Sequence, residues 1–569
     1  MGQPSSFKRA VNSQICVRVS GKHNDLEDVG KDLTHLTSFE MLGNWSFGDY
    51  YKIEAIEWAW SFLTDTLNIP KNRLVATVFE KDEEAKSIWE NNTDISNKQI
   101  VKCDASDNFW EMGKIGPCGP CSEIHVYLND ADIDFELNQD VLNSGKFIEL
   151  WNLVFIQYNR LENGDLQPLP HKHVDTGAGF ERLCAFLQGT SSNYNTDLLK
   201  PIINKIEQLS GKKYSDDLTG MPHRVIADHV RTLCFGIADN IYPSNDGKGY
   251  VLRRLLRRAC RYAKKLGVDK PLIYECVDMV VGTMGNHFDH LIDKQKVIKK
   301  VILAEEESFL TTLSSGLMLF EKVASQCIKD NSNVISGAES FKLYDTFGFP
   351  IDLTCLLAEE KNISVDLDSF QLLLNYQKER SRKSSKFSQH ELTENQDIVL
   401  PKQFNGLDIH LAEDLNVAKG GEARVISDRN EKVGLAMHHS ATHILHEVLR
   451  KKLGTHVFQA GSLVDSNRLR FDFSHFEALK ASELEDIEST VNEWISKNIN
   501  VTVSFNDLES AKKMGAMALF GEKYDKQRVR IVKMGDFSVE LCAGTHVKQT
   551  KSIESFKIIS ESAISSGTR

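Results

Sequence analysis

The segment Gly249–Lys265 constrains the fold most, because only a helix sorts its apolar and basic residues onto different faces. Its apolar residues recur at helical spacing, at Leu252, Leu255, Leu256 and Ala259. Seven of the thirteen residues from 253 to 265 are basic, and the segment contains no acid. Solvated helix faces usually mix both signs of charge. We therefore expect this helix to meet an anion, with a phosphate backbone favoured over a plain solvated face.

The rest of the chain is acidic, so contact with nucleic acid must come from local patches. The 569 residues carry a net charge of -12, and the composition is that of an ordinary soluble protein. The eleven cysteines form no disulfide pattern, which favours a reducing compartment. No apolar run approaches membrane-spanning length, and no signal peptide follows Met1. We expect a cytoplasmic protein of three or four domains without a membrane partner.

A glycine-rich segment predicts a phosphate site. Residues 174–183 read Val-Asp-Thr-Gly-Ala-Gly-Phe-Glu-Arg-Leu, with glycines just before an arginine that would start a helix. Such a turn brings a guanidinium and backbone N–H groups onto phosphate. The segment lacks the P-loop pattern and the third glycine of a dinucleotide fingerprint. The alternative is a plain turn in which Arg182 pairs with a surface acid.

Two short motifs far apart in the chain carry metal-ligand chemistry. His439-Ser-Ala-Thr-His443 places two imidazoles one turn apart on a helix, and Cys542-Ala-Gly-Thr-His546 adds a thiolate and a third imidazole. Three nitrogens and one thiolate suit Zn²⁺. No glutamate follows His439, which disfavours a metalloprotease. From the residues alone, a metal site and chance histidines are about equally supported.

Several of these stretches together resemble the alanyl-tRNA synthetase family of class II aminoacyl-tRNA synthetases. The matching segments, which keep the family's order, include residues 16–25, 38–50, 116–123, 149–155, 174–183, 224–231, 243–265, 343–350, 439–443, 461–464, 515–520 and 542–546. The resemblance implies an α+β multidomain fold. It consists of a class II antiparallel β-sheet with flanking helices in residues 1–200, an all-helical tRNA-recognition domain in 201–383, a linker or remnant β module in 384–432, and an α/β zinc editing domain in 433–569.

The resemblance implies an ATP site in the first domain. Arg18 would hold the α-phosphate with Lys22 nearby, Phe39 would stack on adenine, and Arg182 would meet the γ-phosphate. Mg²⁺ would accompany ATP. Attack of an amino-acid carboxylate on the α-phosphorus needs no general base, so positioning and charge stabilisation would carry the chemistry.

The same resemblance implies that L-alanine binds next to ATP. Asp175 would accept the alanine ammonium, Gly177 would belong to the same binding turn, and Trp151 would wall a pocket sized for a methyl group. Arg18, Asp175 and Arg182 would then be the catalytic set.

The family also implies contacts with tRNA(Ala). Asn245 and Asp345 would read the G·U pair of the acceptor stem, whose shallow minor groove short polar side chains can reach. The phosphates would fall to the basic helix, at Arg253, Arg254, Arg257 and Arg258. Without the family, Asn245 as a turn residue and Asp345 as a helix cap are the alternatives.

The resemblance gives the metal motifs a purpose. His439, His443, Cys542 and His546 would bind one Zn²⁺ in a domain that hydrolyses mischarged tRNA. An alanine pocket cannot strongly reject serine or glycine, since such differences are worth only ~1–3 kcal/mol. Whether the metal activates water or only positions the 3′ end stays open.

We expect an ATP-dependent alanine–tRNA ligase that also edits Ser-tRNA(Ala) and Gly-tRNA(Ala). By the resemblance, we expect this chain to be without motif 1, part of a Gly-rich barrel and the C-terminal domain, so an editing-only deacylase and a catalytically degenerate tRNA-binding paralogue are the alternatives. The expected partners are tRNA(Ala), ATP and L-alanine. The oligomeric state stays open, with a monomer among the options.

Overall fold

A computed structural model describes residues 7–19, 25–244, 247–330, 332–386, 409–410, 429–454, 456–517, 528–564 and 567–569. Its contacts divide the chain into two compact units. Unit 1 comprises residues 1–241 and 250–310, and unit 2 comprises 242–249 and 311–569.

An eight-stranded sheet forms the centre of unit 1. Its strands are β1 (Arg9–Val17), β2 (Ser38–Phe47), β3 (Leu74–Phe79), β4 (Ile100–Cys103), β5 (Phe109–Glu111), β6 (Gly116–Tyr127), β7 (Phe147–Arg160) and β8 (Leu166–Gly179). The order is β1-β2-β8-β7-β6-β3-β4, and β5 pairs with β6. All these pairs are antiparallel except β3 with β4, so the antiparallel sheet expected from the sequence is confirmed with one parallel edge.

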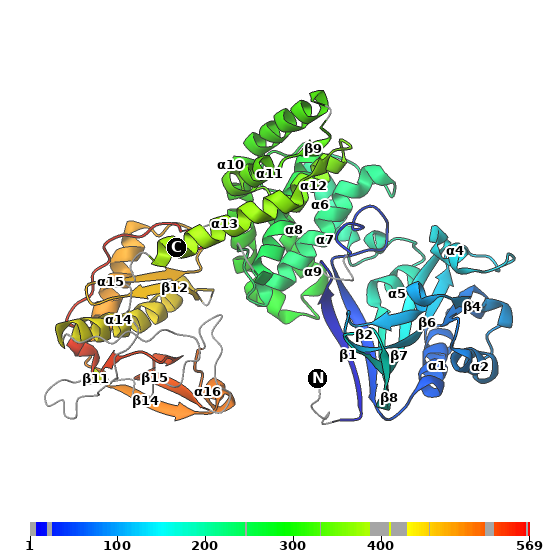
Figure 1. Cartoon of the computed structure of the whole chain (residues 1–569), viewed down its shortest axis with the longest axis horizontal. Coiled ribbons are helices and arrows are strands. Elements are labelled where there is room, and N and C mark those ends of the chain that lie inside the picture. Colours follow the sequence, from blue (N-terminus) through cyan, green and yellow to red (C-terminus); the bar gives the residue numbers. More distant parts are fainter. Residues whose placement is uncertain are drawn as a thin grey trace. The chain divides into compact units, whose positions relative to one another are not determined.

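Helices α1 (Lys52–Ser61) and α2 (Glu83–Asn92) cover one face of this sheet (Figure 1). Apolar residues at helical spacing on α1, including Ile56 and Trp60, pack in one core with strand residues such as Leu153 and Phe155. Side chains alternate between the two faces of a strand. The opposite face of the same strands therefore carries their more polar residues.

The rest of unit 1 is helical. Its helices are α3 (Ala105–Asn108), α4 (Gln139–Val141), α5 (Phe180–Leu187), α6 (Lys200–Ser210), α7 (Met221–Ala238), α8 (Gly247–Lys265, from Tyr250), α9 (Ile273–Met284) and α10 (Asp289–Lys329, as far as Leu310). Helix α7 is buried along almost its whole length, even at Arg224, Asp228 and Arg231. These charges contact the segment between β1 and β2 and the start of α5.

Unit 2 begins with helices and ends in a mixed module. Its helices beyond α10 are α11 (Gly337–Phe347), α12 (Ile351–Glu359), α13 (Leu367–Lys386), α14 (Arg429–Leu453), α15 (Ala481–Ser496) and α16 (Leu508–Lys513). Its strands are β9 (Val334–Ile335), β10 (Ser364–Val365), β11 (Ile409–His410), β12 (Gln459–Val464), β13 (Leu469–Phe473), β14 (Val501–Asn506), β15 (Val529–Met534), β16 (Ser538–Leu541) and β17 (His546–Val547). Helices α14 and α15 share one apolar core with strands of the module.

The sequence predicted the fold class of each region better than the boundaries between the regions. The α+β first region and the helical region after it are confirmed, whereas the compact unit 1 continues past the boundary expected at residue 200. Within the expected linker 384–432, residues 384–386 belong to α13 and 429–432 to α14, and most of the remainder lies outside the described residues. Across the described ranges, no helix combines the length and apolar character needed to cross a membrane.

Candidate functional site

The face of the sheet opposite α1 and α2 gathers predicted nucleotide-site residues from separate strands. Asp175 on β8 pairs in register with Trp45 on β2 and with Val154 on β7. Residues directly opposite in an antiparallel sheet share a face, so these three side chains are neighbours. Gly177 follows on the same face, and a Cβ there would lie 2.4 Å from the sulfur of Met41. Because Gly177 has no side chain, it leaves space on the strand surface beside Asp175.

Two predicted arginines border this face. The guanidinium of Arg18, an exposed residue just after β1, lies 4.8 Å from the ring centre of Phe39. Arg182 sits in the first turn of α5, where its Nη1 donates to the Glu149 carboxylate at 2.8 Å and to the Glu149 carbonyl at 3.0 Å. Both arginines act on the pKa of Asp25, which burial raises and their charges lower. Arg18 and Arg182 thus flank one region of the site, while Lys22 lies outside the described residues.

Two acids that the sequence reasoning missed lie on this face. Glu123 accepts a hydrogen bond from Asn152 at 2.9 Å and lies 3.0 Å from His125. Burial, and then the charge of Glu149, raise the pKa of Glu123. Burial would also raise the pKa of Glu149, but the charges of Arg182 and His125 keep it below its ordinary value. Two carboxylates that repel each other in this way could hold a divalent cation.

The structure does not bring Trp151 to this site. Trp151 pairs in register with Ala178, three positions along β8 from Asp175, and therefore lies on the opposite face of the sheet. There it packs against the core under α1, with its ring 5.7 Å from that of Phe62. The expectation that Trp151 walls a pocket beside Asp175 is wrong. Val154, which is 5% exposed, is the apolar side chain directly across from Asp175.

The basic helix is confirmed as α8, but its arginines do not form an exposed face. Arg253 and Arg258 are only 3% and 4% exposed. Arg253 and Arg257 pair with the buried carboxylate of Glu305 on α10, at 3.2 and 2.8 Å, and Arg254 lies 3.9 Å from Glu27. Burying a guanidinium is tolerated when a carboxylate or carbonyl replaces its water. The expectation of an exposed anion-binding face is wrong for Arg253 and Arg258.

Of the two residues expected to read the acceptor stem, the structure describes Asp345, which lies in unit 2. Asp345 is exposed in the last turn of α11, where its carboxylate accepts a hydrogen bond from Gln377 of α13. Asn245 lies outside the described residues. The tRNA contacts of both residues stay predictions.

The four predicted metal ligands do converge. His439 and His443 lie one turn apart on α14, and Cys542 and His546 lie after β16 and at the start of β17. Their ligand atoms all lie within 4.8 Å of one another. The sulfur of Cys542 is 3.4 Å from Nε2 of both His439 and His546. Tetrahedral zinc bonds of ~2.0–2.3 Å would separate ligand atoms by roughly 3.3–3.8 Å, and both of these sulfur–nitrogen distances fall in that range.

The electrostatics of the cluster favour the ligand forms of two residues. Burial raises the pKa of the Cys542 thiol, but the charge of His439 and hydrogen bonds with the histidines hold it well below its usual range. Burial, together with the charge of His439, lowers the pKa of His546 to about 3. A thiolate and a neutral imidazole are the forms that bind a metal ion.

A second layer of residues fixes the ligands and was not predicted. Glu540 on β16 is buried, with one carboxylate oxygen 2.7 Å from Nδ1 of His443 and the other 3.1 Å from Nδ1 of His446. The hydroxyl of Ser440 lies 3.3 Å from Nδ1 of His546. Carboxylates that hold the far nitrogen of a ligating imidazole are common at zinc sites. Glu540 lies two residues before Cys542, and no motif or spacing in the sequence marked it as part of the metal site.

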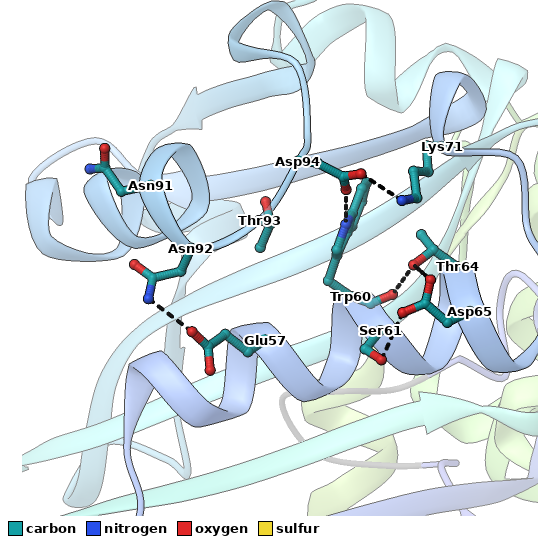
Figure 2. Close-up of a pocket in the computed structure, with 10 residues that line it drawn as sticks. All are labelled: Glu57, Trp60, Ser61, Thr64, Asp65, Lys71, Asn91, Asn92, Thr93 and Asp94. Carbon is teal, nitrogen blue, oxygen red and sulfur yellow. Dashed lines mark hydrogen bonds and ion pairs between the residues drawn. The ribbon is translucent and has the colours of Figure 1, made fainter.

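A separate surface hollow of about 490 Å³ lies between α1 and α2 (Figure 2). Several of its polar side chains pair with one another (Figure 2). Asp94 accepts a hydrogen bond from Trp60 at 2.6 Å, and Glu57 accepts one from Asn92 at 2.8 Å. It contains none of the predicted site residues, and we assign it no function.

Comparison with known proteins gives a consistent result. Residues 1–439 match the family model described as tRNA synthetases class II (A), and residues 529–569 match the threonyl and alanyl tRNA synthetase second additional domain. The alanine–tRNA ligase of Chlorobium phaeobacteroides is 43% identical, and the match covers 99% of this chain and 72% of that protein. The alanine–tRNA ligase of Chlorobaculum tepidum is also 43% identical, and the match covers 99% of this chain and 73% of that protein. The alanine–tRNA ligase of Bacteroides fragilis is 41% identical over 642 residues, covering 100% of this chain and 73% of its own length. The chain belongs to the alanine–tRNA ligase family of class II tRNA synthetases.

Proposed function

We propose that this protein is an ATP-dependent alanine–tRNA ligase that also hydrolyses mischarged Ser-tRNA(Ala) and Gly-tRNA(Ala). One observation carries the synthetic half: Arg18, Phe39, Asp175 and Arg182 come from different elements and border one face of the sheet. Relatives named alanine–tRNA ligase match nearly the whole chain, which supports the choice of amino acid. The expected cytoplasmic location stays a prediction.

The site residues suit amino-acid activation. A carboxylate oxygen of alanine forms a bond to the α-phosphorus of ATP, and the bond from that phosphorus to the pyrophosphate oxygen breaks. Arg18 and Arg182 would stabilise the charge on the phosphates, and Asp175 would hold the ammonium of alanine. Val154, opposite Asp175, offers a small apolar wall for the methyl group.

Glu123 and Glu149 are the residues that would hold Mg²⁺ accompanying ATP. They lie on the same sheet face as Asp175, and the repulsion between their carboxylates is one that a dication would relieve. When bound, Mg²⁺ would supply positive charge for the departing pyrophosphate. Arg182 engages Glu149 through Nη1 alone among the described residues, which leaves Nε and Nη2 for a phosphate.

We propose that His439, His443, Cys542 and His546 hold one Zn²⁺ and that this metal centre serves editing. Three nitrogens and a thiolate at these separations suit zinc better than magnesium or calcium, which prefer oxygen. Residues 529–569 match a domain that alanyl and threonyl synthetases have in common. In this proposal the four residues fix the metal, and the aminoacylated 3′ end binds beside it.

The assay that tests the synthetic half is alanine-dependent ATP–pyrophosphate exchange. We expect exchange with alanine, and slower exchange with serine and glycine, because one hydroxyl or one methyl group is worth only ~1–3 kcal/mol. If the folded protein shows no exchange but deacylates Ser-tRNA(Ala), the protein is an editing-only deacylase. Binding of tRNA(Ala) with neither activity would leave a degenerate paralogue.

Glu540→Gln should weaken zinc binding by about 10- to 100-fold, because it removes the carboxylate that orients His443 while keeping its shape. Competition with a chromophoric chelator measures the affinity directly. Glu493→Gln, the same change at an exposed ion pair on α15, should leave the affinity unaltered. Equal zinc affinity for Glu540→Gln and the parent protein would contradict the role given to Glu540.

A further inference from the structure

Helix α8 makes a contact with the nucleotide site that its charge pattern did not suggest. Arg258 is buried, and its Nη1 donates a hydrogen bond to the backbone carbonyl of Leu26. Leu26 is 1% exposed and packs in one small cluster with Val19 and Leu255. Helix α8 thus holds Leu26 in two ways: Leu255 packs against its side chain, and Arg258 donates a hydrogen bond to its backbone carbonyl.

The segment held in this way packs beside the site, because Leu26 is in one cluster with Val19, the residue that follows Arg18. Asp25, the neighbour of Leu26, lies within the electrostatic influence of both Arg18 and Arg182. A shift of Leu26 would therefore move a negative charge relative to the two arginines that flank the phosphate region.

The far side of the segment is fixed by α7. Arg224 donates through Nε to the carbonyl of Gly30 at 2.9 Å, and Asp228 accepts from the amide of Thr37 at 2.8 Å. Gly30 has φ of +90°, and a Cβ there would lie 2.5 Å from a methyl of Val225. With Gly30 and Thr37 held by α7, the carbonyl of Leu26 is where α8 adds its own restraint.

We propose that Arg258 is a positioning residue of the nucleotide site, which fixes the segment Asp25–Gly30 so that Asp25 stands at a set distance from Arg18 and Arg182. This inference rests on the proposed function, since it assumes that ATP binds between those arginines. It replaces, for Arg258, the direct contact with RNA phosphate that the sequence suggested.

The test measures ATP–pyrophosphate exchange for Arg258→Met and Arg258→Lys. We expect Arg258→Met to raise KM for ATP about tenfold while KM for alanine changes less than about twofold, and Arg258→Lys to recover most of the loss because an ammonium can still donate to the carbonyl. Glu305→Gln is the matched control, because it disturbs buried charges on α8 through Arg253 and Arg257 rather than through Leu26. The control should lower the melting temperature without raising KM for ATP.

An unchanged KM for ATP in Arg258→Met, or an equal rise in Glu305→Gln, would overturn the proposal. Hydrogen exchange of peptides spanning residues 25–31 gives a second readout that needs no activity. Protection should fall in Arg258→Met or, if that variant does not fold, in Arg258→Lys to a smaller extent. Parent-like protection in the folded variants would overturn the contact, whereas a parent protein without exchange activity would overturn only the function on which the inference rests.

Discussion

Replacing Arg182 with alanine should reduce alanine-dependent ATP–pyrophosphate exchange by about a thousandfold, the usual effect of removing a preorganised charge from a developing transition state. Arg182 lies in the first turn of α5, directly after the glycine-containing end of β8, and borders the same region as Arg18. Its loss also removes the partner of the Glu149 carboxylate. Phosphate binding and the electrostatic balance of the acidic pair should therefore fail together.

Three controls make that result specific. Arg182→Lys should recover only part of the rate, because an ammonium lacks the two-pronged geometry of a guanidinium. Arg9→Ala removes an arginine of the same unit that pairs with Asp49 at the sheet edge, and should keep the parent rate. The zinc content of Arg182→Ala should equal that of the parent protein. Exchange within tenfold of the parent rate in Arg182→Ala would contradict the place given to Arg182.

The metal cluster shows what spacing in a sequence can predict. His439 and His443 are four residues apart, which on any helix places both imidazoles on one side. The pairing of α14 with the Cys542–His546 segment could be guessed only from the family, because about a hundred residues separate them. Glu540 had no such signal, since a carboxylate that orients a ligand can come from any strand that passes behind it.

The error at Trp151 has a simple geometric origin. Val154 pairs with Asp175 and Trp151 pairs with Ala178, so these two residues of β7 face opposite sides of the sheet. An irregularity in the pairing between Trp151 and Glu149 returns Glu149 to the side of Asp175. The sequence does not state which side carries the ligand. Both residues lie in the stretch that resembles the family, and only the register with Asp175 separates the wall residue from the core residue.

The prediction that the basic helix α8 exposes an anion-binding face was wrong for a different reason. A run of arginines without acids forms an exposed anion-binding face only if no carboxylate or carbonyl elsewhere in the chain packs against it. Here the partners are distant in the chain: Glu305 lies about fifty residues after Arg253 and Arg257, and the Leu26 carbonyl lies more than two hundred residues before Arg258. Charge patterning within one helix cannot reveal a backbone carbonyl that folds onto it.

His443→Ala should reduce zinc content to background and abolish deacylation of Ser-tRNA(Ala), while alanine–ATP exchange stays within about twofold of the parent rate. His443 is one of the four residues of the cluster, and a site with three remaining ligands binds zinc far more weakly. The residues proposed for activation belong to unit 1, whose sheet has an apolar core of its own, separate from that around α14. The two activities should therefore separate cleanly in this variant, with serine accumulating on tRNA(Ala).

His438→Ala is the matched control, because it removes the adjacent imidazole on the same helix. The Nδ1 of His438 lies 2.9 Å from the carbonyl of Asp465 and is not one of the four ligand atoms. This variant should keep zinc and deacylation. Retention of zinc by His443→Ala would refute the ligand set. Retained deacylation after complete loss of zinc would instead show that the metal does not serve hydrolysis, and equal zinc loss in His438→Ala would trace the effect to α14 as a whole rather than to one ligand.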